Sequence, residues 1–246
     1  MITQAIDIAS SEDANLIKLR HKPAADNSTQ PFKPRLHSTA DTRARPIEGS
    51  IGVVGTPMKF AGKAEIYGEG EPAEYLYQVI TGTVRTSKFL ADGRRQIGGF
   101  YLPGEIFGLE AGEEHSYSAE AIVESRILLI KRSALVGLAA RDTEVAQQLL
   151  ALTWLELARA QAHVLLLVKT AQERVAGFLL EMAGRIPEGG SIELPMSRQD
   201  IADYLGLTIE TVSRTLTSLE NEAVISRPTS RLVVLRNRSA LTRIDP

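Results

Sequence analysis

The chain has 246 residues, 43% of them hydrophobic and 24% charged, and a formal net charge of -2, which is the balance of an ordinary globular protein with room for two modest domains. It contains no cysteine, which excludes disulfides, thiolate metal sites, cysteine-ligated iron–sulfur clusters and cysteine nucleophiles. No apolar run reaches the length of about eighteen residues that a membrane span needs, and the N-terminus lacks a secretory pattern, so we expect a cytoplasmic protein without membrane contact.

The first part of the chain divides into two regions of different composition. Residues 1–48 are rich in Ser, Thr, Asp, Pro and Ala and show little periodicity, which predicts a disordered extension. Residues 49–140 alternate turn signals with short β-rich runs, such as Tyr75–Ile80, Thr83–Phe89 and Ile127–Ile130. The pair Asp92-Gly93 is typical of a tight hairpin turn. We therefore expect a compact antiparallel β-domain, a barrel or a jelly roll.

A long helix is predicted within residues 141–170. From about Thr143 to Val168 the chain has neither glycine nor proline, and its apolar residues are too many for a single face. One face can contact the β-domain while the other contacts a second copy of the chain; a helix packed wholly within one chain is the alternative. The predicted dimer seam recurs at alternating spacings of four and three and consists of Leu150, Trp154, Leu157, Gln161, Val164 and Val168.

The last region, residues 171–246, begins with a predicted helix over about Ala171–Arg185 and continues with the spacing of a helix-turn-helix. Ser197 to Asp200 has the form Ser-x-x-Asp, in which the hydroxyl and the acid cap a helix start. Gly206 permits the tight path between two helices, the second of which starts after Thr208. An ordinary helical hairpin shares most of these features. The expected inward residues are Ile201, Ala202, Leu205, Val212 and Leu216.

An arginine-rich β-hairpin is predicted directly downstream. Two β-rich runs, Val224–Arg227 and Leu232–Leu235, flank the turn Pro228–Arg231. Between Ala223 and Arg243 there are five arginines and no acid. This cluster fits a wing that contacts DNA phosphates, and it also fits a solvated charged surface.

The second helix of such a motif enters the major groove with its N-terminal half. Here its outward residues, which we expect to read bases, are Ile209, Glu210, Ser213 and Arg214. Arg214 can donate two hydrogen bonds to guanine and Glu210 can accept one from cytosine, and the two can also form an ion pair on one helix face. Phosphate contacts are expected from the helix starts and the wing, namely from Ser197, Arg198, Gln199, Thr208, Thr211, Arg227 and Arg231.

From about residue 50 onward the chain resembles the CRP/FNR superfamily of bacterial transcription regulators. The stretch Met196–Arg214 is similar to the family's DNA-binding signature, and Ala91–Ile97 with Leu102–Glu105 is similar to its β-roll. The resemblance implies an α+β fold with an N-terminal cyclic-nucleotide-binding-like β-roll (jelly roll), a long dimerisation helix and a C-terminal winged helix-turn-helix. The FixK-like branch is the most similar one, because Glu210, Ser213 and Arg214 match its Glu-x-x-Ser-Arg motif.

That branch implies a mode of action. A homodimer would bind double-stranded DNA at a TTGAT-N4-ATCAA-type palindrome with half-sites about 34–36 Å apart, mainly as an activator of microoxic respiration or nitrogen-fixation genes. The turn from Asp92 to Gln96 resembles a surface by which some members touch RNA polymerase. Members that bind cyclic AMP carry an Arg-Ser pair where this chain has His115-Ser116, so we expect no small-molecule cofactor.

Other functions remain as alternatives. The β-roll could bind a small effector that shifts a DNA-competent conformation. A metalloenzyme needs clustered histidine and carboxylate ligands, whereas the four histidines are scattered along the chain, so we predict no enzyme activity and no metal site. A partner-binding β-module with an incidental helical tail is the last alternative, and sequence-specific DNA binding would exclude it.

Overall fold

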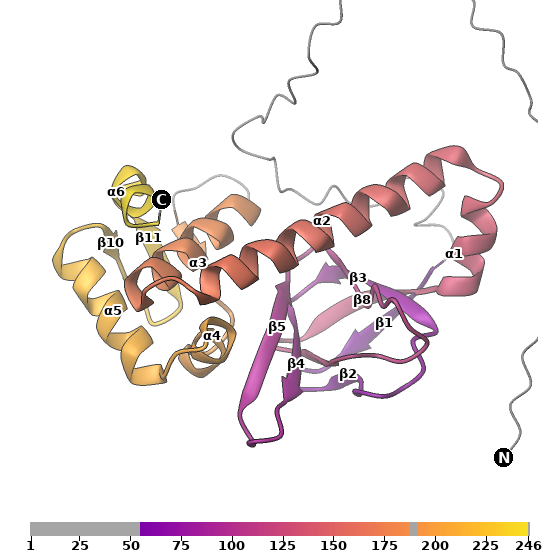
Figure 1. Ribbon diagram of the computed structural model, residues 1–246, viewed down its shortest axis with the longest axis horizontal. Coiled ribbons are helices and arrows are strands. Elements are labelled where there is room, and N and C mark those ends of the chain that lie inside the picture. Colours follow the sequence, from indigo (N-terminus) through magenta and orange to yellow (C-terminus); the bar gives the residue numbers. More distant parts are fainter. Residues whose placement is uncertain (1–54, 187–190, 246) are drawn as a thin grey trace, which may run out of the picture. The chain divides into compact units, whose positions relative to one another are not determined.

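The computed structural model describes residues 55–186 and 191–245, and the predicted extension over residues 1–48 lies outside them (Figure 1). The described chain begins with short antiparallel strands in two four-stranded sheets of order β1-β8-β3-β6 and β2-β7-β4-β5. The strands are β1 (Gly55–Phe60), β2 (Glu65–Tyr67), β3 (Tyr75–Thr81), β4 (Val84–Phe89), β5 (Arg95–Tyr101), β6 (Ile106–Phe107), β7 (Ser118–Ala121) and β8 (Ser125–Lys131).

The hydrophobic core of this β-domain lies between the two sheets. Because side chains alternate across a strand, each sheet turns one face inward. One sheet contributes Tyr67 and Val84, and the other contributes Tyr77, Phe107 and Ile127, all of them buried. The predicted antiparallel β-domain is therefore confirmed.

The hairpin between β4 and β5 forms where the Asp-Gly pair predicts it. Gly93 has a φ of +83°, which glycine adopts with little strain because it has no Cβ. The backbone N–H of Leu90 donates to the carbonyl of Arg94 and closes the turn at 2.8 Å. The hairpin holds β5 in register with β4, which places Arg95 opposite Phe89.

Three helices follow the strands: α1 (Arg132–Ala139), α2 (Thr143–Leu167) and α3 (Ala171–Arg185). The carboxylate of Asp142 accepts hydrogen bonds from two backbone N–H groups in the first turn of α2. Thr170 and Glu173 form a capping box at the start of α3. The predicted long helix and the helix after it are confirmed, whereas α1 was not predicted.

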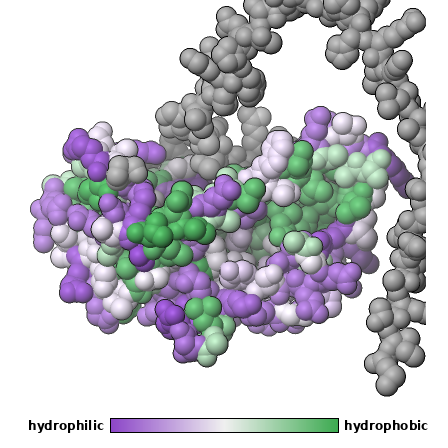
Figure 2. Space-filling model, in the orientation of Figure 1, coloured by the Kyte–Doolittle hydropathy of each residue, from purple (hydrophilic) through white to green (hydrophobic). Residues whose placement is uncertain are grey.

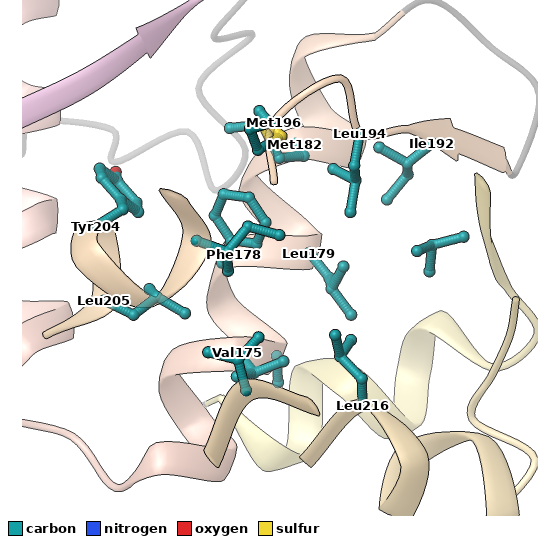
Figure 3. Close-up of a cluster of buried hydrophobic side chains, with 14 of the residues drawn as sticks. Val175, Phe178, Leu179, Met182, Ile192, Leu194, Met196, Tyr204, Leu205 and Leu216 are labelled. Atoms are coloured by element: carbon teal, nitrogen blue, oxygen red, sulfur yellow. The ribbon is translucent and has the colours of Figure 1, made fainter. Parts of the chain in front are cut away.

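The C-terminal part contains β9 (Ser191–Glu193), α4 (Arg198–Leu205), α5 (Ile209–Asn221), β10 (Ile225–Ser226), β11 (Leu232–Leu235) and α6 (Arg238–Ile244). Strands β10 and β11 form the predicted hairpin, and β9 adds a third antiparallel strand on the other side of β11. Figure 3 shows side chains from α3, β9, α4 and α5 converging on one buried cluster, with Phe178 and Leu179 of α3 at its centre.

Candidate nucleic-acid interface

Helix α4 begins and ends as the sequence predicts. The Ser197 hydroxyl accepts from the backbone N–H of Asp200, and the Asp200 carboxylate accepts from the backbone N–H of Ser197 at 2.9 Å, a complete capping box. Gly206 ends α4 with a φ of +61°, and Thr208 caps the start of α5. The two helices of the motif are thus joined by only three residues.

The helix-turn-helix core has the predicted inward residues. Ile201, Ala202 and Leu205 of α4 and Val212 and Leu216 of α5 are all buried. Since residues three and four apart share a helix face, burial of this face leaves the opposite face of α5 outward. The result is a second helix that stands on the first with its polar side exposed.

The predicted base-reading residues lie on that outward side of α5. Ile209, Glu210 and Arg214 are exposed, and Ser213 is half-buried. The pKa of the Glu210 carboxyl lies below its ordinary value, because backbone hydrogen bonding at the helix start and the Thr208 side chain stabilise its charge. Glu210 is therefore ionised at neutral pH and can act only as an acceptor.

The ion pair that Glu210 and Arg214 could form is not among the close ion pairs of the described residues, although the positive charge of Arg214 still helps to lower the pKa of Glu210. The backbone N–H groups in the first turn of α5 compete with the Arg214 guanidinium for the Glu210 carboxylate, because they attract it toward the start of the helix. The Arg214 side chain is exposed, so its guanidinium is accessible from solvent. An arginine in this state can offer its two donors to an incoming group such as a guanine edge.

The wing carries arginines whose side chains are already oriented. Arg227 donates through Nε and through its terminal nitrogen to the Glu220 carboxylate at 3.0 and 2.5 Å, and this bonding holds the pKa of Glu220 below its ordinary value. Arg198, the first residue of α4, donates to the Ser230 carbonyl in the wing turn at 3.0 Å, and Arg231 of the wing is exposed. Glu220 was missed in the sequence, because the acid lies on α5 and its partner lies in the wing.

The remaining predicted phosphate contacts lie at the two helix starts. Ser197, Gln199 and Thr208 are exposed, and Thr211 is half-buried with its hydroxyl 3.1 Å from that of Thr208. Gln199 donates to the Asp203 carboxylate at 2.6 Å. These groups border the exposed face of α5, so they are available to a DNA backbone that lies across the ends of α4 and α5.

The predicted dimer seam of α2 is exposed in the single chain. Figure 2 shows apolar surface over the C-terminal end of α2, where Val164, Leu165 and Val168 are all exposed. A continuous exposed apolar stripe marks an interaction surface. The seam residues Leu150, Trp154, Leu157, Gln161, Val164 and Val168 are without exception exposed.

By length and composition alone α2 could cross a membrane, since it has 25 residues and a mean hydropathy of 1.2, and only 6% of its most apolar window is buried. Its middle, however, carries Glu156 and Arg159, which form an ion pair at 2.9 Å. Arg159 also pairs with Glu105 of the β-domain at 2.7 Å. Charges at the centre of a bilayer are costly, so the stripe favours a protein surface over lipid.

Two family models match the chain. A cyclic nucleotide-binding domain matches residues 57–142, and a Crp-like helix-turn-helix domain matches residues 173–244. The chain belongs to the CRP/FNR family. The predicted fold of this family, a cyclic-nucleotide-binding-like β-roll followed by a winged helix-turn-helix, is confirmed, and the protein is a DNA-binding transcription regulator.

The similar proteins place the chain in the FixK-like branch of the CRP/FNR family. It is 53% identical over 212 residues to the nitrogen fixation regulation protein FixK of Azorhizobium caulinodans, covering 84% of this chain and 85% of that one. It is 46% identical over 178 residues to FixK of Rhizobium meliloti, covering 72% and 81%. The structure of FixK2 from Bradyrhizobium japonicum matches with a TM-score of 0.75 and 52% identity over 78% of this chain and 98% of that one.

The residues of this β-roll do not fit a cyclic nucleotide. His115 and Ser116 lie where a phosphate-binding pair would be needed, but the His115 ring is buried and stacks on Tyr67 with centroids 3.6 Å apart. The Ser116 hydroxyl donates to the Glu110 carboxylate at 2.9 Å, so an acid occupies the position where an anion would bind. Aromatic rings, including Tyr77 and Phe107, fill the space between the sheets.

His115 gives the β-roll a predicted pH dependence. Burial lowers the pKa of its imidazole below 6.5, although Glu110, 3.6 Å from Nδ1, acts in the opposite direction. As the pH falls below about 6.5, His115 becomes protonated in the unfolded chain but stays neutral in the folded chain. The free energy of unfolding therefore decreases until the pH reaches the lowered pKa of the folded state. We expect the melting temperature to decrease between about pH 7.5 and pH 5.5, and to decrease less in His115→Phe. Equal decreases in both proteins would assign the pH dependence to other groups.

Proposed function

We propose that two copies of this chain bind a TTGAT-N4-ATCAA-type palindrome in the cytoplasm and act there mainly as an activator, without a small-molecule cofactor. In this proposal residues 49–140 form the β-roll, residues 141–170 the dimerisation helix and residues 171–246 the DNA-binding domain. The observation that carries the proposal is the exposed N-terminal half of α5, on which Glu210, Ser213 and Arg214 share one outward face.

The chemistry of that face supports sequence-specific binding. Arg214 offers two parallel donors that match the O6 and N7 acceptors of guanine, and the ionised Glu210 accepts from the amino group of cytosine. Ile209 offers an apolar contact to a thymine methyl group. A half-site that contains A·T steps and one G·C pair satisfies all three side chains.

The surface of α2 supports a two-fold dimer, and a two-fold dimer would bind a palindromic site. The exposed seam on α2 is apolar except at Gln161, and a groove of about 850 Å³ lies beside it between α2, α3 and α6. A second copy that packs on this face buries both features at once. The two α5 helices would then read the two half-sites in opposite orientations.

The regulated genes are proposed from the relatives. The FixK proteins of Azorhizobium caulinodans and Rhizobium meliloti are named as nitrogen fixation regulation proteins, and we propose nitrogen-fixation or microoxic respiration genes for this chain. RNA polymerase is the proposed partner of the β4–β5 turn. Only Asp92, Gly93 and Arg94 are exposed there, because Arg95 and Gln96 contact α4. The polymerase surface is therefore narrower than the predicted Asp92–Gln96.

Fluorescence anisotropy with the purified protein tests the proposal. We expect tight binding to a TTGAT-N4-ATCAA duplex and weak binding to a scrambled duplex without added ligand. Removal of the Arg214 side chain in Arg214→Ala should lower selective affinity at least about 30-fold, since one bidentate base contact contributes about 1–3 kcal/mol and a dimer loses one such contact in each of two half-sites.

Arg141→Ala is the matched control, because it removes an exposed arginine from the loop before α2 and should leave binding unchanged. Equal weak binding of the wild type to both duplexes would contradict the proposal and would favour an effector-gated regulator. Equal losses in the two variants would mean that Arg214 contributes only charge.

A further inference from the structure

One carboxylate of the helix-turn-helix is bound by two arginines of the β-roll. Arg85 of β4 donates to Asp200 Oδ1 at 2.6 Å, and Arg95 of β5 donates to the same oxygen at 2.7 Å. The Asp200 side chain is 4% exposed. Its other oxygen, Oδ2, accepts from the backbone and hydroxyl of Ser197 and so caps α4. We refer to Arg85, Arg95 and Asp200 as the clamp.

The arginines of the clamp are themselves fixed in place. Arg85 pairs with Glu120 of the neighbouring strand β7 at 2.8 Å, which orients its guanidinium within the sheet. Arg95 also donates to Asp203, one turn further along α4, at 2.7 Å. Because each partner is held by a second contact, the clamp fixes both the position of α4 on the β-roll and its rotation about its own axis.

The surface around the clamp continues the same contact. Gln96 of β5 donates to the Tyr204 carbonyl, and Ile97 and Phe100 are buried in the same cluster as α4 and α5. Helix α4 therefore rests on one strand through apolar side chains, with the charged groups at one edge.

A buried ion pair contributes little net stability, because removing two charges from water costs about as much as their attraction returns. Such an ion pair instead favours one relative arrangement of the two elements, because any other arrangement leaves charges buried and unpaired. A palindrome demands such geometry, because each base pair added between half-sites moves them apart by about 3.4 Å. We propose that Arg85 and Arg95 are positioning residues for DNA binding that fix the angle of α4 and α5 on the β-roll and thereby select the half-site spacing.

This inference rests on the proposed reading of a palindrome by a dimer. The test compares duplexes with spacers of three, four and five base pairs. In Arg85→Met/Arg95→Met we expect affinity for the four-base-pair spacer to fall about 10-fold and the preference over the other spacers to fall at least about 5-fold. A loss of folded protein would lower binding to all duplexes equally and leave the preference unchanged.

Lys88→Met is the matched control. Lys88 lies on β4 like Arg85, and its ion pair is with Glu69 at 2.8 Å, away from α4. We expect wild-type affinity and spacer preference from this variant. Arg95→Lys, which keeps the charge, should restore part of the spacer preference that Arg95→Met loses.

A distance measurement tests the clamp without DNA. Because the chain has no cysteine, spin labels can be attached at Lys59→Cys on β1 and Asn221→Cys on α5, and dilution with unlabelled protein isolates the distances within one chain. We expect one narrow distance distribution in the wild type and a broad one in Arg95→Met. Unchanged distances and unchanged spacer preference would overturn the inference. If the wild type binds no palindrome, the proposed function fails, while the distances still decide whether the clamp orients α4.

Discussion

The Val164→Glu protein is expected to be a monomer with at least about a hundredfold lower affinity for a palindromic duplex. Val164 lies in the seam of α2 and is 64% exposed in the single chain. In a two-fold dimer a residue of this seam faces the same residue of the second copy, so one substitution acts twice. Burial of a valine contributes about 1.5–3 kcal/mol, and a buried unpaired carboxylate costs several more, whereas about 1.4 kcal/mol already changes an equilibrium tenfold.

Val136→Glu is a closely matched control for this experiment. Val136 lies on α1, is 63% exposed and would undergo the same chemical change outside the seam. We expect it to sediment as a dimer and to bind DNA as the wild type does. Sedimentation equilibrium measures the loss of the dimer, and anisotropy on the same samples measures the loss of DNA affinity, so the two can be compared directly. A Val164→Glu protein that sediments as a dimer would show that the two chains associate through another surface.

Local sequence patterns predicted α2, α3 and the helix-turn-helix because their signals lie within one or two turns. The Ser197–Asp200 capping box and the φ of Gly206 depend only on neighbouring residues, and both were predicted. Helices α1 and α6 and strand β9 were missed. Strand β9 has three residues, which are too few for a periodic signal, and it is stabilised by pairing with β11 about forty residues later.

The clamp could not be predicted for a related reason. Asp200 fits a capping box, so local reasoning has already given its carboxylate a role, yet the second oxygen binds Arg85, 115 residues away in the chain. Arg227 shows the same limit. Its place in a basic hairpin predicted a phosphate contact, and the structure adds that Glu220 orients its guanidinium. Patterns therefore indicate which groups are charged, while the fold decides which of them remain available to DNA.

The largest effect on stability is expected from Phe178→Ala, at about 3–5 kcal/mol of unfolding free energy. Phe178 of α3 is 1% exposed, and its ring lies 6.2 Å from that of Phe100 on β5 and 5.9 Å from that of Tyr204 on α4. Its removal leaves a cavity where the β-roll, α3 and α4 meet, and these rigid elements cannot all move to close it.

Phe89→Ala is the control for the same chemical change, because Phe89 is 70% exposed at the end of β4 and should alter stability by no more than about 0.5 kcal/mol. Urea unfolding at one protein concentration measures both variants, since the stability of a dimer depends on concentration. A cost below about 1 kcal/mol for Phe178→Ala would mean that α3 and α4 move together to fill the cavity. In that case the clamp would have to move as well, because Arg95 fixes α4 to β5, the strand on which Phe100 lies, and Arg85 fixes it to the neighbouring strand β4.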